Sequence, residues 1–388
     1  MEGCPPGTVF LASVSGGADS VAMLAALAAV KAQDTPLHCI HIEHGIRPAA
    51  ESRGDAEFVR SLCKELHVPC RIVSIKPGKV AAAAKSRGIG IEAAARHYRR
   101  RAWFREARRL EAELSQPVRI LVAHTADDML ETALMRIFRG SGPSGLAAMP
   151  AARGRILRPL IAVNRRDILD YLGEKKLAWR EDATNADIQF LRNRIRHQLI
   201  PQLNEHFPQW RGAIAALAET QSLAADFIRK EAKRRISWNS TLHCSLLTAH
   251  CSLFFAQPAI IREEALFQGI NQLSVPVKIK RKNIRRFAEG NCAAVDLGAL
   301  QLRRDPQHIT ILPVEKDDGF GSHPRRTQPP KGGLLFSDTA DFSCAGTGRI
   351  YPPTPFDRAL YRFPHSPLPP PHSPSSSPPL QTRLSLLI

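Results

Sequence analysis

A short run of glycine, serine and aspartate carries the residue types that phosphate binding needs. Residues 15–20 read Ser-Gly-Gly-Ala-Asp-Ser and follow the apolar segment VFLASV. Glycines let backbone amides approach an anion closely, and serine hydroxyls add further donors. Aspartate at such a place can cap a helix or help to hold Mg²⁺. We therefore expect phosphate groups to be held by Ser15, Gly16, Gly17, Ala18, Asp19 and Ser20.

The run lacks the lysine of a Walker A loop, because Ala18 and Asp19 follow the two glycines. That lysine normally reaches the β- and γ-phosphates during γ-phosphate transfer. The sequence instead predicts a loop that cradles a pyrophosphate, helped by the dipole of a helix beginning near Asp19, which contributes roughly 0.3–1 kcal/mol. A structural turn without a ligand is the alternative. A second glycine pattern at residues 88–93 follows an alanine-rich run rather than a strand, and we discard it as a dinucleotide site.

Paired carboxylates mark the start of another expected helix, at Asp127, Asp128 and Glu131. Asp128 and Glu131 are three residues apart and therefore share one helical face. Such a pair can hold Mg²⁺ or orient an incoming base and amine. The alternative is a helix cap with favourable dipole charge. We expect Asp128 and Glu131 to be catalytic, and Asp19 and Asp128 to be metal ligands.

The elements that must position these residues alternate between β-rich and amphipathic runs. Strands are expected at residues 9–15, 37–44, 70–75 and 119–125, and helices at 20–31, 49–66, 90–112 and 127–139. This alternation predicts an α/β fold with a doubly wound parallel sheet of the Rossmann-like type, whose sites lie at the carboxyl ends of the strands. Residues 139–145, RGSGPSG, read as a loop that serves as a lid, a hinge or a plain connector.

Composition divides the chain into three parts. Residues 1–205 are assigned to the sheet domain, and residues 206–315 to a smaller, mostly helical or α+β domain. From 316 to 388 proline and serine dominate without an apolar period, so we expect a disordered tail. A proline-rich ligand for a partner module is the alternative, and a shift of reading frame would also produce so abrupt a change.

The charge and cysteine content narrow the class of protein. The formal net charge of +18 indicates a polyanionic partner, whose phosphates the basic runs at 229–235 and 278–286 would contact. A basic surface without a partner is the alternative. The eight cysteines form no Cys-x-x-Cys pair, so we expect no zinc ribbon or iron–sulfur site and mostly buried, reduced thiols. No leader pattern or membrane-length apolar run is found, so we expect a cytosolic protein without a membrane partner.

Five stretches in order resemble the tRNA(Ile)-lysidine synthetase family of the PP-loop, or N-type ATP pyrophosphatase, superfamily. They are SGGADS, HIEHGIR (41–47), AHTADDMLETALMRIFRGSGPSGLAAM (123–149), LRPL (157–160) and EDATNADIQFLRNRIRHQLIPQL (181–203). The resemblance implies a ligase that cleaves ATP to AMP and pyrophosphate. It implies that the wobble cytidine of an isoleucine tRNA with a CAU anticodon is adenylated on its C2 oxygen, and that free L-lysine then displaces AMP to leave lysidine.

The resemblance also assigns residues. Arg96 and Arg99 fall on the family's ARxxRY pattern, where they would meet ATP phosphates, Arg99 in a catalytic role. ATP and Mg²⁺ are the implied cofactors. Arg192 and Arg196 are four apart, so both could address phosphates from one helical side, although a solvated face is the alternative. The residues implied to contact tRNA or substrate are Asn185, Arg192, Asn193 and Arg196.

Two other functions remain open from the sequence. One is another PP-loop enzyme that thiolates tRNA, although such relatives commonly need cysteine pairs. The other is a tRNA-binding protein with impaired catalysis, because Met129 stands where the family has Gln and Arg100 where it has Tyr. Whether the chain forms a homodimer also stays open.

Overall fold

The computed structural model describes residues 4–31, 35–46, 49–181, 188–240 and 246–314, apart from 274, 276 and 278. One sheet has six strands in the order β3-β2-β1-β4-β6-β5. β1 (Val9–Ser13), β2 (Leu37–Glu43), β3 (Cys70–Ser74), β4 (Val118–Val122) and β6 (Ile156–Leu157) are parallel, and β5 (Ala152–Arg153) is antiparallel to β6. The strand order switches direction between β1 and β4, where such sheets open a site.

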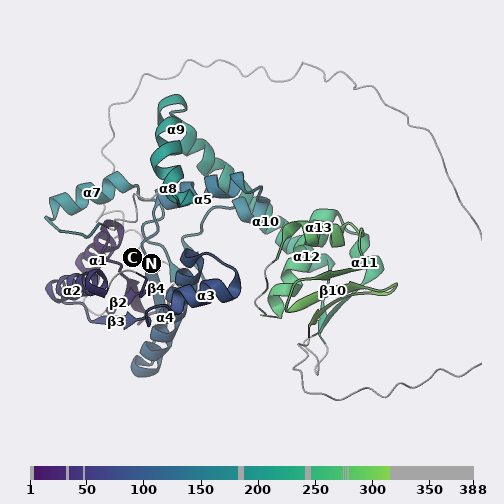
Figure 1. The fold of residues 1–388 in the computed structure, drawn as a ribbon, viewed down its shortest axis with the longest axis horizontal. Helices are drawn as coiled ribbons and strands as arrows, with labels where there is room; N and C mark the ends of the chain where they lie inside the picture. Colours follow the sequence, from purple (N-terminus) through teal and green to yellow (C-terminus); the bar gives the residue numbers. More distant parts are fainter. Residues whose placement is uncertain are drawn as a thin grey trace, which may run out of the picture. The chain divides into compact units, whose positions relative to one another are not determined.

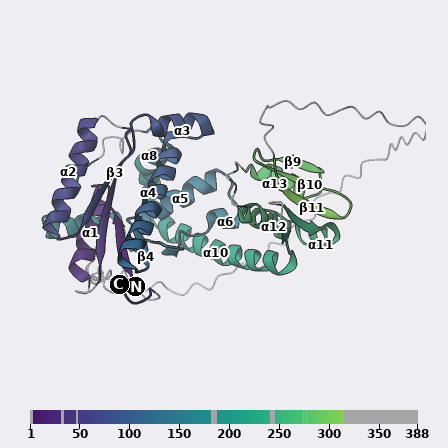
Figure 2. The same ribbon diagram turned by 90° about the horizontal axis from the view of Figure 1, so that it is seen from below.

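Helices cover both faces of this sheet, which confirms the predicted doubly wound α/β fold (Figures 1 and 2). α1 (Ala18–Val30), α2 (Ala49–Glu65) and α7 (Arg165–Glu174) bury one face, and α4 (Ile91–Leu114) buries the other. The central strand β1 is almost fully buried because neither of its faces meets water. α3 (Lys79–Arg87) ends with Gly88 as its C-cap, so the second glycine pattern follows a helix and not a strand, and it leads into α4.

The fourth strand is shorter than predicted. It ends at Val122, because Thr125 is already the N-cap of α5 (Ala126–Phe138). The intervening His124 therefore lies in a turn at the carboxyl end of the sheet. The predicted loop at 139–145 is also partly helical, since Pro143 begins the short helix α6 (Pro143–Leu146).

A helical segment packs against α5. It consists of α8 (Leu191–Arg194), a π-helical turn η2 (Ile195–Leu199) and α9 (Ile200–His206), and it continues into α10 (Trp210–Arg235). One apolar cluster joins these elements through Leu130, Leu134, Ile195, Ile200 and Trp210. This packing holds the basic residues of α8 and η2 against the acidic start of α5.

A second, antiparallel sheet has five strands in the order β7-β8-β11-β10-β9. The strands are β7 (Asn239–Ser240), β8 (Leu247–His250), β9 (Ala294–Asp296), β10 (Leu300–Arg304) and β11 (His308–Pro313). They are joined by α11 (Cys251–Phe255), α12 (Ala259–Gln272) and α13 (Arg281–Ala288), with Phe254 and Phe287 fully buried. This antiparallel sheet with its helices agrees with the predicted smaller, α+β part of the fold.

Two further predictions concern a C-terminal tail and the lack of membrane-spanning segments. The predicted tail, residues 316–388, lies outside the described residues. In the part that is described, no helix combines the length and the apolar character that a membrane span requires. The domain boundaries at 205 and 315 stay predictions.

Candidate active site

The glycine-rich loop joins β1 to α1, and its shape depends on glycine at one position. Gly16 has φ +96°, a left-handed conformation that a side chain would strain. Its α-carbon faces α2, where a β-carbon would come within 3.6 Å of Phe58 and Val59. The carbonyl of Gly16 accepts a 3.0 Å hydrogen bond from the amide of Arg180. The loop is therefore fixed from two sides by segments distant in sequence.

The hydroxyl of Ser20 organises the inside of the loop. Its Oγ accepts hydrogen bonds from the amides of Ser15 (3.1 Å) and Gly16 (3.2 Å) and donates to the carbonyl of Gly17 (2.9 Å). The predicted amide donors of Ser15 and Gly16 are thus engaged within the loop. Ala18 and Asp19 occupy the first two positions of α1, where amides have no partner inside a helix. Amides at the start of a helix suit an anion as their acceptor.

Asp19 faces a carboxylate and an arginine from other helices. Arg165, the first residue of α7, forms an ion pair with Asp19, and its backbone amide donates to Asp127 at 2.8 Å. Burial raises the pKa of Asp19, against the opposing effect of Arg165, and the nearby Asp128 raises it further. Arg165 therefore ties the starts of α1 and α5 together.

The acidic start of α5 is held by a cap and by two arginines. Asp128 forms a capping box with Thr125, in which its carboxylate accepts from the Thr125 amide at 2.9 Å. The other oxygen of Asp128 accepts from Arg192. Glu131 is only 1% exposed, and it accepts from Nε of Arg192 (2.7 Å) and Nε of Arg196 (2.6 Å). The carboxylates predicted to be catalytic are thus paired with the arginines predicted to contact substrate.

The π-helical turn supplies the geometry for this pairing. Arg196 lies inside η2, directly after α8, which carries Arg192. A π-turn widens the helix locally and often occurs at functional sites. The guanidinium groups of Arg192 and Arg196 both contact Glu131, so the two side chains extend from the same side of the helical segment, as expected. Their partner in this structure is a carboxylate and not a phosphate.

A second cluster is strongly basic and has little neutralising charge. His124 lies among Arg158, Arg96, Arg99 and Arg192, and burial followed by these positive charges lowers its pKa to about 3. Arg158 is 8% exposed, and its Nη1 donates to the carbonyl of Pro150 at 2.8 Å. Within the described ranges, Nε of Arg99, Nε of Arg158 and Nδ1 of His124 are buried without a hydrogen-bond partner.

Buried, positively charged hydrogen-bond donors that lie close together destabilise the folded protein unless an anion accepts their hydrogen bonds. His124 and Arg158 follow the carboxyl ends of β4 and β6, and Arg96 and Arg99 lie near the start of α4. Among the residues that the structure describes, no carboxylate forms an ion pair with Arg99 or Arg158. We call His124, Arg96, Arg99 and Arg158 the anion cluster, because a phosphate group fits their chemistry.

Comparison with known proteins gives two kinds of match. The PP-loop domain family matches residues 5–203. A protein of Vibrio cholerae serotype O1 named tRNA(Ile)-lysidine synthase is 30% identical, over 79% of this chain and 68% of the relative. The chain belongs to the tRNA(Ile)-lysidine synthase family.

Other members of the tRNA(Ile)-lysidine synthase family are similar over shorter stretches. The relative from Treponema denticola is 41% identical over 53% of this chain and 43% of its own length. The relative from Solibacter usitatus is 38% identical over 74% of this chain and 59% of its own length. The chain thus spans only part of the length of these curated relatives.

The site residues that the sequence of this chain predicted fall into separate groups. Residues 15–20 form the loop, Asp128 and Glu131 lie with Arg192 and Arg196, and Arg96 and Arg99 belong to the anion cluster. Asn193 lies between the two arginines in sequence, on α8. Asn185 lies outside the described residues.

Four residues near these groups were missed by sequence reasoning: His124, Arg158, Arg165 and Arg180. Arg180 binds the loop through its amide and pairs with Asp55 on α2 through its side chain. His124 and Arg158 stand in stretches that carry the family resemblance, and this was the signal that could have found them. Arg165 and Arg180 had none, because their partners are far away in sequence.

The predicted metal ligands can be judged by their donor atoms. Asp19 and Asp128 offer carboxylate oxygens, the donor type that Mg²⁺ takes from proteins alongside phosphate oxygens. Besides burial, the charge of Asp128 raises the pKa of Asp19, as expected for two nearby carboxylates. In this structure each is ion-paired, Asp19 with Arg165 and Asp128 with Arg192, so an ion would compete with guanidinium groups.

The two basic runs are partly neutralised. In the first, Arg229 pairs with Asp226, and Arg234 and Arg235 both pair with Glu231. In the second, Arg281 and Arg285 pair with Glu263. Fewer positive charges than the sequence suggested are therefore free to meet a polyanion in the described part of these runs.

Proposed function

We propose that this protein ligates free L-lysine to C2 of the wobble cytidine in an isoleucine tRNA with a CAU anticodon. In the first step the C2 oxygen attacks the α-phosphate of ATP, and pyrophosphate leaves. In the second step an amino group of lysine adds at C2, AMP departs with the oxygen, and lysidine remains. Membership of the tRNA(Ile)-lysidine synthase family supports this reaction.

The proposal rests mainly on the anion cluster. This cluster lies at the carboxyl ends of the strands, as the glycine-rich loop does. Nε of Arg99 and Nε of Arg158 are buried without a hydrogen-bond partner among the described residues, and such guanidinium groups suit the phosphates of ATP. We assign Arg96 and Arg99 to these phosphates, with Arg99 stabilising charge on the α-phosphoryl group, and add Arg158 and His124. Residues 15–20 are assigned to the outer phosphates through the first amides of α1.

The carboxylates of α5 are assigned to the second substrate. Asp128 and Glu131 would accept hydrogen bonds from the amine of lysine and orient it towards C2. Arg192 and Arg196 hold both carboxylates in the free protein, so they shift when lysine or the tRNA backbone arrives. Mg²⁺ bound by Asp19 and Asp128 would neutralise phosphate charge, and Asn185 and Asn193 are assigned to tRNA.

The decisive experiment incubates the protein with ATP, radiolabelled lysine and the isoleucine tRNA bearing the CAU anticodon. We expect label in tRNA, with release of AMP and pyrophosphate that requires both tRNA and lysine. The matched control is the same tRNA with uridine at the wobble position, which should take no label. Pyrophosphate release that ignores lysine and tRNA, or no label with folded protein, would reject the proposal.

The same assay separates the two rival functions. Sulfur in the modified tRNA, in place of an added lysine, would indicate thiolation. Tight tRNA binding without pyrophosphate release would indicate a binding protein with impaired catalysis. Arg100, which stands where the family has tyrosine, lies 5.9 Å from the Phe104 ring, and its positive charge adds to the effect of burial in lowering the pKa of Arg96 and of Arg158 in the anion cluster.

The remaining predictions about the chain are also proposals. We propose a sheet domain at 1–205, a tRNA-contacting domain at 206–315 and a tail at 316–388. A cytosolic location is proposed because free lysine, ATP and tRNA meet there. Homodimer formation is left to a measurement of mass in solution.

A further inference from the structure

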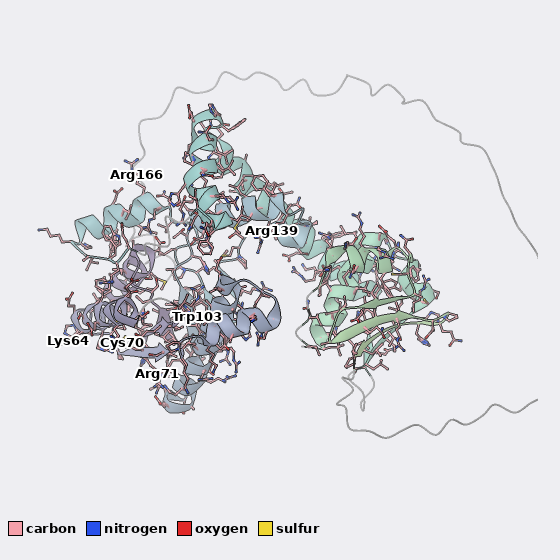
Figure 3. The ribbon with its side chains drawn as sticks, in the orientation of Figure 1. Lys64, Cys70, Arg71, Trp103, Arg139 and Arg166 are labelled. Atoms are coloured by element: carbon pink, nitrogen blue, oxygen red, sulfur yellow. The ribbon has the colours of Figure 1, made fainter. Side chains whose placement is uncertain are left out.

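Three cysteines that are far apart in sequence meet in the interior of the first sheet domain. Their sulfur atoms, from Cys39, Cys63 and Cys70, all lie within 4.8 Å of one another. Cys39 is on β2, Cys70 is its registered partner at the start of β3, and Cys63 is near the end of α2, so three elements contribute one thiol each. Figure 3 labels Cys70. We call these residues the thiol cluster.

We propose that the thiol cluster binds a thiophilic divalent ion of the Zn²⁺ and Cd²⁺ class through three thiolates. Thiolate ligands select such soft ions, and sulfur binds zinc at about 2.3 Å, which places sulfurs about 3.8 Å apart around a tetrahedral ion. The observed separations need to contract by no more than about 1 Å, which rotation of the side chains provides. Water fills the fourth position.

The surroundings suit bound thiolates. Donation from the thiols of Cys39 and then Cys63 lowers the pKa of Cys70, and the positive charges of His41 and Arg60 lower it further. An ion that binds the cluster displaces protons from its thiols. Cys39 and Cys63 are buried whereas Cys70 is half-buried, which leaves an entry path from one side.

The position of the cluster gives the ion a structural role. Cys63 follows Val59 by four residues on α2, a distance of about 6 Å along the helix, and Val59 supports Gly16 of the glycine-rich loop. An ion at the cluster would fasten α2 to β2 and β3 behind that loop. This inference stands independently of the proposed ligase reaction, because its readout is metal binding.

The first test titrates Cd²⁺ into reduced, metal-free protein and follows the sulfur-to-cadmium charge-transfer absorption. We expect saturation at one equivalent with the intensity of three thiolates, and an increase in the melting temperature. Cys39→Ser and Cys63→Ser should lose at least a third of the intensity and most of the affinity. The control Cys251→Ser changes a buried cysteine of the second sheet, whose thiol donates to the Asp305 carbonyl, and should match wild type.

The second test needs no variant and so does not depend on the variants folding. X-ray absorption of the Zn²⁺-loaded wild-type protein should give three sulfur neighbours at about 2.3 Å. A shell dominated by nitrogen and oxygen would overturn the inference. So would a charge-transfer band that the Cys39 and Cys63 substitutions leave unchanged, or a stable disulfide within the cluster in protein purified under reducing conditions.

Discussion

The contact between Glu131 and the two arginines can be tested by a double-mutant cycle. Glu131→Gln removes the carboxylate that accepts from Nε of Arg196 at 2.6 Å and from its Nη2 at 3.1 Å. The guanidinium then keeps only Asp128, at 3.9 Å. Arg196→Met removes the other partner. If each charge acted alone, the two losses of unfolding free energy would add.

The expected coupling follows from the exposure of the two side chains. Breaking a fully buried ion pair costs about 3–5 kcal/mol, whereas an exposed pair contributes about 0.2–1 kcal/mol. Glu131 is 1% exposed and Arg196 is 40% exposed, so water partly screens one charge. We therefore expect a coupling energy of about 1–2 kcal/mol, between these limits.

The assay is urea unfolding of wild type, both single variants and the double variant, followed by circular dichroism and tryptophan fluorescence. The matched control is the pair of Asp226 and Arg229, whose side chains are 59% and 53% exposed. A cycle of Asp226→Asn and Arg229→Met should give no more than about 0.5 kcal/mol. Additivity within about 0.5 kcal/mol for the Glu131 cycle would contradict the expected coupling between the two charges.

Three further predictions concern the phosphate side of the site. Burial, and next to it the charge of Arg158, lowers the pKa of His124 to about 3. Histidine-selective NMR should show this pKa rise when pyrophosphate or ATP neutralises the anion cluster. Titration of His124 near the usual 6.5 in the free protein would contradict this prediction. Arg158→Met should weaken ATP binding, measured by calorimetry, about 10- to 100-fold, the equivalent of a hydrogen bond to a charged group. The control Arg155→Met, which changes an arginine at the amino end of β6 that pairs with Glu111, should leave ATP binding unchanged. Because burial raises the pKa of Asp19 above 3.8, the wild type loses stability as pH rises from 3.8 through the folded-state pKa. Asp19→Asn should therefore unfold at a higher urea concentration than wild type at pH 7 while abolishing pyrophosphate release; a lower midpoint would mean that ionised Asp19 stabilises the fold.

Local patterns in the sequence predicted most of the sheet domain. Alternating apolar strands and amphipathic helices carry their own periodicity, and the loop at residues 15–20 carries its own glycines, so both can be read without knowledge of distant residues. The main error was local too, because the fourth strand was extended through His124 although Thr125 is a helix cap. Strands β7 and β8 carry no comparable local pattern, because both are short, β7 pairs with β8, and β8 pairs with β11 far along the chain.

The sequence by itself determined the fold class, the phosphate-type loop and the acidic start of α5, since each depends on neighbouring residues. Only the tertiary structure decided which charges meet: Arg165 pairs with Asp19 across 146 positions, and Arg192 with Glu131 across 61. Among the described residues, it alone left Arg99 and Arg158 without an ion-paired carboxylate and gathered three cysteines whose spacing follows no motif. The physical reason is that ion pairs and thiol contacts require proximity in space, which packing of whole helices creates and no local pattern encodes.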